Sequence, residues 1–198
     1  MHLGNSIVVD FEIEQYGPVC EALLTAAQPT ELGPGRPNSD CRDQLGKLDS
    51  ATVFSGQPIV DVNMAVCCES GLWLLHNYLD ESHQISQGIH TPTGSFWHGI
   101  MHRREPDFSN AKYWFRKMGE HPIFDSLLEA ARRITAAQPE DTADVFLAEQ
   151  AGWNPAAFVD ACESVSRGRS TNASLCQAIA LAEWQLLFDH CFRAAIGL

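Results

Sequence analysis

The chain has 198 residues, a length that suits one domain, and 45% of them are hydrophobic, which is enough to bury a sizeable core. Its net charge of -12 argues against a nucleic-acid binder or a protein of anionic membranes, because phosphate-dense partners select positive surfaces. The sequence starts without the basic and apolar regions of a signal peptide, and its odd number of cysteines, seven, favours reduced thiols. We therefore expect a cytoplasmic protein that binds neither nucleic acid nor membrane.

The first part of the chain predicts one helix followed by a long connection. Residues 11–27 carry apolar side chains at helical spacing after Gly17-Pro18, and the helix should end before Pro29. Residues 28–58 are rich in Gly and Pro, so we expect a connection with a short helical turn at 43–48. A connection of this length is typical of a functional or a mobile segment.

Residues 61–86 are predicted to form one long helix at the centre of the fold. Hydrophobic side chains between 72 and 79 surround its axis, and a helix that is apolar on every side is buried. Glu69 and His76 lie seven residues apart, on one stripe that extends toward His83, so both are expected inside the protein. A buried carboxylate must be paired, protonated or bound to a cation, because burying it alone costs several kcal/mol.

The rest of the chain predicts further helices, with bounds set by caps, Gly and Pro. Pro106 and Gly119 end two of them, and Asn154-Pro155 is a cap and first-turn pair. One helix is predicted to start at Thr93 or Ser95 and end at 105, the next to start at Asp107 or Ser109 and end at 119, and the last to start at Ser170 or Asn172 and end at 196. The ranges 121–137, 139–150 and 155–168 are predicted between them. Alternating strand patterns are nearly absent, so the sequence predicts an all-α fold, a single multi-helical domain (1–198) with a buried central helix.

The strongest chemical pattern is formed by His98, His102 and Glu105. Their spacing places two imidazoles and a carboxylate on one side of a helix, where they can bind zinc, iron or manganese. Glu69 and His76 are the candidates to complete such a site. The alternative is a hydrogen-bonded polar face or the wall of a cleft, and the stripe could face solvent, because hydrophobic residues occupy the opposite side of the same helix.

The same groups allow acid–base chemistry without a metal. Burial would raise the pKa of Glu69, and an imidazole such as that of His76 exchanges protons near neutral pH. We therefore predict Glu69, His76 and Glu105 as catalytic groups. Structural ion-pair networks perturb pKa values as well, so this pattern does not choose between catalysis and structure.

The stretch 95–119 is locally basic within an acidic chain. Its basic residues are Arg103, Arg104, Lys112, Arg116 and Lys117. They can bind an anionic substrate, or they can form ordinary ion pairs with neighbouring carboxylates. Arg104 is the strongest candidate, since it projects toward the apolar side of its helix, where a cation needs a specific partner. The predicted substrate-binding residues are Arg103, Arg104, Asn110 and Lys112.

A sequence resemblance covers about the middle third of the chain. A group of uncharacterised bacterial and fungal proteins contains a segment that resembles WHGIMHRREPDFSNAKYWFRKMGEHP (97–122), preceded by NYLDESHQISQ (77–87). The resemblance implies a site in this region and brings no activity, cofactor or catalytic residue with it. The sequence thus favours an enzyme that acts on a small anionic molecule, by hydrolysis or isomerisation, through a metal or an acid–base pair. A non-catalytic ligand-binding or interaction protein with structural histidines is the alternative.

Overall fold

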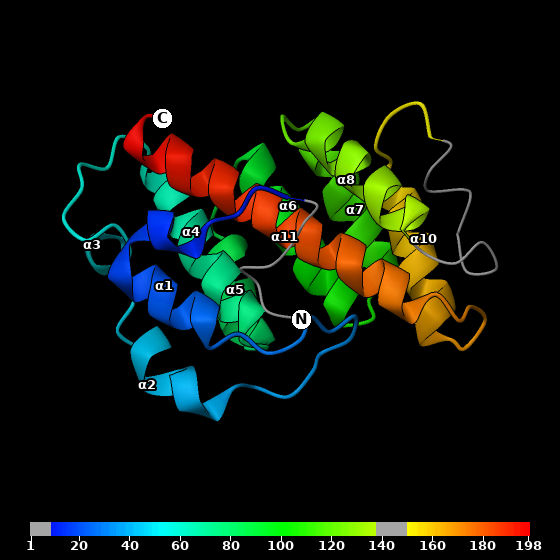
Figure 1. Ribbon diagram of the computed structural model, residues 1–198, viewed down its shortest axis with the longest axis horizontal. Coiled ribbons are helices and arrows are strands. Elements are labelled where there is room, and N and C mark those ends of the chain that lie inside the picture. The colour runs from blue at the N-terminus through cyan, green and yellow to red at the C-terminus, as the bar shows by residue number, and fades with distance from the viewer. Residues whose placement is uncertain (1–8, 138–149) are drawn as a thin grey trace.

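Helices account for all the regular structure in residues 9–137 and 150–198, which are the residues that this computed structural model describes. The predicted all-α class is therefore confirmed (Figure 1). Within the same residues, no helix combines the length and the apolar character that crossing a membrane requires. The helix predicted at 139–150 falls almost entirely outside the described residues.

The N-terminal helix forms close to its predicted position. A 3-10 turn, η2 (Ile13–Tyr16), leads into α1 (Gly17–Thr25), which has a proline in its first turn, where the missing N–H costs nothing. The predicted connection contains three short helices: η3 (Ser39–Cys41), α2 (Arg42–Leu45) and α3 (Ser50–Val53). Hydrogen bonds fix it to the helices beside it; for example, the backbone N–H of Asn38 donates to the carbonyl of His76 at 3.0 Å.

The prediction of one continuous helix over 61–86 is wrong, because the structure divides it into α4 (Val62–Leu75) and α5 (Leu79–Ser86). Asn77 interrupts the helix with a left-handed backbone conformation, φ 65°, which Asn tolerates better than most residues. Its side chain is held from outside the helix, since its Oδ1 accepts a hydrogen bond from the guanidinium of Arg104 at 2.6 Å. The interruption lets α5 fold back along α4 instead of extending it.

A tight corner joins α6 (Pro92–Arg104) to α7 (Phe108–Met118). Asp107 caps α7, because its carboxylate accepts from a backbone N–H of the first turn at 3.2 Å. The two helices pack closely because Gly99 has no side chain: a Cβ there would lie 2.9 Å from the ring of Phe115. Every residue of α6 from 93 to 104 is buried, so α6 is a second interior helix.

Three more helices complete the described fold: α8 (Phe124–Ala136), α10 (Pro155–Ser166) and α11 (Ala173–Ile196). The Asn154 side chain caps α10, as its Asn-Pro sequence predicts. The long helix α11 crosses the molecule in Figure 1 and packs against α4 and α8.

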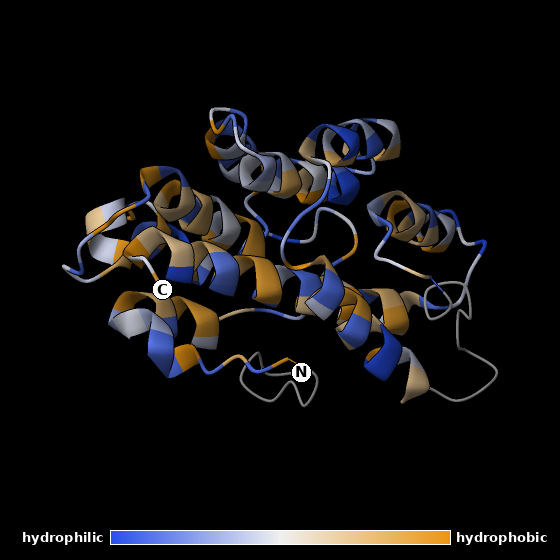
Figure 2. Ribbon diagram, turned by 90° about the horizontal axis from the view of Figure 1, so that it is seen from above, coloured by the Kyte–Doolittle hydropathy of each residue, from blue (hydrophilic) through white to orange (hydrophobic). Residues whose placement is uncertain are grey.

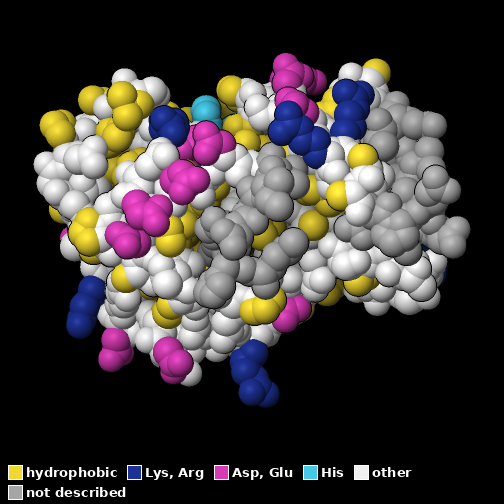
Figure 3. All heavy atoms as spheres, viewed as in Figure 1, with side chains coloured by type: hydrophobic (Ala, Val, Ile, Leu, Met, Phe, Trp, Pro, Cys, Tyr) yellow, Lys and Arg dark blue, Asp and Glu magenta, His cyan; other side chains and the backbone are white. Residues whose placement is uncertain are grey.

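The core forms where α4, α6 and α11 meet. The predicted buried central helix is α4, whose residues 65, 67, 68 and 70–74 are buried. The indole N–H of Trp184 in α11 donates to the carbonyl of Gly71 at 2.9 Å, and a Cβ at Gly71 would lie 2.8 Å from the ring of Trp97. Hydrophobic residues lie mostly where helices face one another (Figure 2). On the face shown in Figure 3, acidic side chains form a row left of centre, and basic side chains are spread around the edge, with some beside acidic ones at the upper right.

Candidate metal centre

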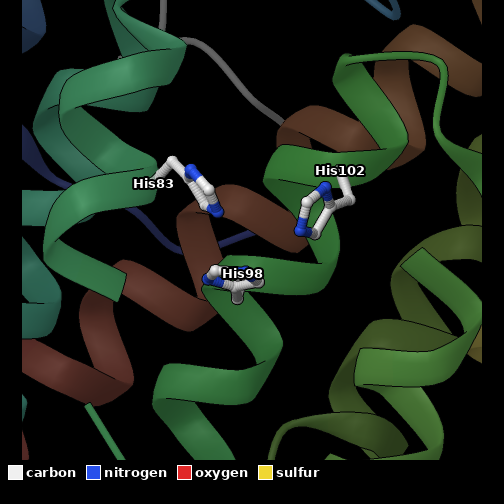
Figure 4. Close-up of side chains that lie close together, drawn as sticks. All are labelled: His83, His98 and His102. Atoms are coloured by element: carbon white, nitrogen blue, oxygen red, sulfur yellow. The ribbon is translucent and has the colours of Figure 1, made fainter. Parts of the chain in front are cut away.

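Three histidine side chains converge where α5 packs against α6. His98 and His102 lie one turn apart on α6, as their spacing predicts, and His83 comes from α5 (Figure 4). Each residue offers one ring nitrogen, and these three nitrogens lie within 4.8 Å of one another. The ring of His98 is central, with its centroid 4.7 Å from those of His83 and His102. Two helices thus bring three potential metal ligands to one point.

The separation of the three nitrogens suits one divalent metal after small side-chain rotations. Zinc binds imidazole nitrogen at about 2.0–2.1 Å, so three ligands of a tetrahedral site stand about 3.3 Å apart. Imidazole is a ligand that zinc and iron accept readily, whereas manganese prefers oxygen. Three histidines would leave a fourth position for water or substrate, which is the arrangement of catalytic rather than structural zinc sites.

The two histidines of α6 lie inside the protein and are neutral. His98 is 2% exposed and His102 is 6% exposed, so the expectation that this stripe faces solvent is wrong, whereas a hydrogen-bonded polar face is still the alternative to a metal site. Burial, followed by the nearby His102 and His83, lowers the pKa of His98 to about 3. Burial also lowers the pKa of His102, although the carboxylate of Glu105 acts in the opposite direction. Neutral imidazole is the form that binds metals.

Ser86 is the hydrogen-bond partner of His98. The Ser86 oxygen lies 2.9 Å from Nδ1 of His98 and 3.3 Å from the backbone carbonyl of His83. When the hydroxyl donates to the carbonyl, its oxygen accepts from the Nδ1–H of His98, and when it donates to Nδ1, the imidazole proton is on Nε2. The first arrangement is the one that leaves a lone pair on Nε2 for a metal.

Glu105 fixes the tautomer of His102. Its Oε2 lies 3.0 Å from Nδ1 of His102, and a carboxylate can only accept, so the proton of a neutral His102 is on Nδ1. A carboxylate behind a ligating imidazole orients the ring and makes it more basic. Glu105, which the sequence suggested as a metal ligand, is thus placed behind a ligand, and His83 occupies the third position of the cluster.

The amide of Asn110 lies over the ring face of His102. Its nitrogen is 3.0 Å from Nε2 and 3.4 Å from Nδ1. The lone-pair directions of the two ring nitrogens diverge in the ring plane, so a donor aligned with one would be far from the other. Because the amide nitrogen of Asn110 is nearly equally far from Nδ1 and Nε2 of His102, its N–H contacts the face of the ring. The lone pair of Nε2, which lies in the ring plane, is therefore available to a metal. Asn110, a predicted substrate-binding residue, supports a candidate ligand in this structure.

The structure does not bring Glu69 and His76 into the histidine cluster. Glu69 is half-buried and accepts from the Ser50 hydroxyl of α3 at 2.8 Å, while burial raises the pKa of its carboxyl group. Nδ1 of His76 lies 3.1 Å from the amide of Asn38, and burial lowers the pKa of His76 to about 4. These residues lie on the side of α4 that faces α3 and the long connection, so the expected site shared with α6 is not formed.

The three predicted substrate-binding cations have partners within the protein. Arg103 forms a fully buried ion pair with Glu183 of α11. Lys112 forms an ion pair with Asp160 of α10. Arg104 donates to Asn77 and to three backbone carbonyls, those of Gly33, Pro34 and Leu74. Each side chain therefore joins α6 or α7 to another part of the fold.

The sequence did not predict a role for His83, the third member of the cluster. It lies at the end of the stripe through Glu69 and His76, but a continuous helix would have carried it away from α6. The signal that could have placed it is the pair Asp80 and Glu81, because acidic residues are typical of the first turn of a new helix.

Comparison with protein-family models, with curated proteins and with solved structures found no match to this chain.

Proposed function

We propose that the protein is a metal-dependent enzyme that acts on a small anionic molecule, with a divalent metal bound by His83, His98 and His102. The observation that carries the proposal is the convergence of these three imidazoles, with one nitrogen of each within 4.8 Å of the others, supported by hydrogen-bond partners of His98 and His102 in Ser86 and Glu105. Zinc is the favoured ion, since neutral imidazoles suit it; iron is the next candidate and manganese the least favoured.

The chemistry that fits this ligand set is hydrolysis. A divalent zinc ion with three histidine ligands lowers the pKa of a bound water to about 7, which supplies a nucleophile at neutral pH. Glu105 would keep His102 oriented and basic, and Ser86 would do the same for His98. His83 is half-buried and Glu105 lies at the surface, so a small molecule could reach the cluster from that side.

A non-catalytic protein with structural histidines is the second candidate. It is favoured by the contacts that His98 and His102 already make with Ser86, Glu105 and Asn110, because these contacts join α5, α6 and α7 without any ligand. Acid–base catalysis by Glu69 and a histidine is less favoured, since the partner of Glu69 is Ser50.

Elemental analysis of the untagged, purified protein tests the proposal. We expect about one metal ion per chain, lost in a His98→Ala/His102→Ala double variant and retained in His90→Ala, a control at an exposed histidine outside the cluster. Circular dichroism checks that each variant is folded. A metal-free wild-type protein that also fails to bind added zinc would refute the metal centre and favour structural histidines.

The expected cytoplasmic location is part of the same proposal. All seven cysteines lie in the described residues, where all are buried and none forms a disulfide. Free thiols are typical of a reducing compartment.

A further inference from the structure

An indole with a lysine on its face lies beside the histidine cluster. The ring of Trp114 in α7 packs on His98, with ring centroids 4.1 Å apart. The ammonium group of Lys117 lies 4.3 Å from the centroid of Trp114. The two residues are three apart on α7 and therefore lie on one side of that helix. This side of α7 carries a cation toward the candidate metal centre.

The charge of Lys117 is not neutralised by an ion pair within the described part of the chain. Its side chain is exposed, and the contact recorded for its ammonium group is the face of Trp114. A cation–π contact positions an ammonium group while leaving its full charge and its N–H donors available. Trp114 contacts both the ammonium group and the ring of His98, so Lys117 lies beside the cluster.

The candidate metal centre would itself attract an anion. Three neutral imidazoles do not reduce the charge of a divalent ion, so the bound metal would be the largest local charge. Glu105 contacts His102, whereas Lys117 lies on Trp114 beside His98, so negative and positive side chains lie next to different members of the cluster. The positive charge of Lys117 would therefore stabilise an oxyanion bound to the metal on the side that faces this residue.

We propose that Lys117 binds the anionic group of the substrate, a phosphate or a carboxylate, with one oxygen on the metal and another accepting from the ammonium group. Charge-assisted hydrogen bonds of this kind are stronger than neutral ones. The inference rests on the proposed metal centre and deepens it, because it names the substrate class and a residue that selects it. Trp114 is the positioning residue that holds the ammonium group.

The test uses the full chain loaded with cobalt(II), whose visible absorption reports on its ligands. Inorganic phosphate and acetate are titrated separately into wild-type protein, Lys117→Gln and Arg116→Gln, so the better-bound anion identifies the group. Arg116→Gln is the matched control, since Arg116 is exposed on the same helix, one residue away, and the variant loses the same charge.

We expect the preferred anion to change the cobalt spectrum, with an apparent Kd that rises about tenfold in Lys117→Gln and stays unchanged in Arg116→Gln. A normal cobalt spectrum with the same Kd in wild type and Lys117→Gln would overturn the role of Lys117 alone, as would a spectrum that neither anion changes. Wild-type protein that acquires no cobalt spectrum would overturn the metal centre, and this inference with it.

Discussion

Replacing Glu183 with Gln should strongly destabilise the fold, because it leaves Arg103 buried without its counter-charge. The two side chains are 0% and 2% exposed, and they meet through two guanidinium–carboxylate contacts, one of them 3.2 Å long. The guanidinium also lies over the ring of Phe158, 4.5 Å from its centroid. Water therefore cannot solvate the arginine after the carboxylate is lost.

The magnitude follows from the burial of the pair. At 3.2 Å and an effective dielectric constant of about 20, the attraction is about 5 kcal/mol, most of which offsets the desolvation of both groups. Removing one partner only leaves a buried unpaired charge, which costs about 3–5 kcal/mol. For a chain of this size, that loss lowers Tm by roughly 6–20 °C.

Urea unfolding followed by circular dichroism measures the effect in Glu183→Gln, Arg103→Met and the double variant. We expect the double variant to recover most of the stability, to within about 1–2 kcal/mol of wild type, because no buried charge remains. Arg133→Met breaks an exposed ion pair and should cost less than about 1 kcal/mol. The reasoning is refuted if Glu183→Gln costs less than about 1 kcal/mol, or if the effects of the two single variants simply add.

Three further predictions test the cluster, the pH response and the core. His83→Ala should weaken zinc binding at least about 100-fold, measured by competition with a chelator, while Gln84→Ala should not change it. His76 is neutral when folded, with a pKa of about 4, but in the unfolded chain it takes up a proton near pH 6.5. Stability should therefore fall as the pH drops from about 6.5 to about 4, by about 3 kcal/mol, and His76→Gln should remove that part of the slope. Gly71→Ala should cost about 1–3 kcal/mol in thermal unfolding, because its Cβ would press on Trp97.

Each of these three predictions has an experimental outcome that would contradict it. Unchanged zinc affinity in His83→Ala would remove that residue from the cluster. A His76→Gln variant with the same pH dependence as wild type would mean that the proton uptake occurs elsewhere. Gly33→Ala is the control for the core substitution, since a Cβ there meets nothing within 4 Å, and equal Tm losses at both glycines would contradict the packing argument.

Most of the fold could be predicted because local signals set its helix ends. Asp107 and Asn154 begin α7 and α10 with side-chain caps, and the 3.6-residue period is visible along α8, whose residues 124, 127, 128, 131, 134 and 135 are buried. The division between α4 and α5 has only one local signal, the acidic pair Asp80 and Glu81 at the start of α5. The apolar pattern continues through it without Gly or Pro, and Asn77 holds its left-handed conformation through Arg104, a contact 27 residues along the chain.

The candidate site was only partly predictable for the same reason. His98 and His102 share one helix, so their spacing was enough to place them together. His83 joins them only because α5 folds back along α4. Glu69 accepts a hydrogen bond from Ser50, a contact that residue spacing within one helix does not predict. The partners of Arg103 and Lys112 lie 80 and 48 residues away, so their pairing depends on helix packing.

The contact between Arg104 and Asn77 links the interruption after α4 to the end of the helix that carries His98 and His102. Arg104 touches none of the three imidazoles, yet it anchors the bend that aims α5, and thus His83, at them. A variant of Arg104 could therefore lose metal without losing any ligand. Such a loss of metal would show that the alignment of α5 with α6 had changed. Asn77→Ala, which removes the other side of the same contact, should cause the same loss of metal.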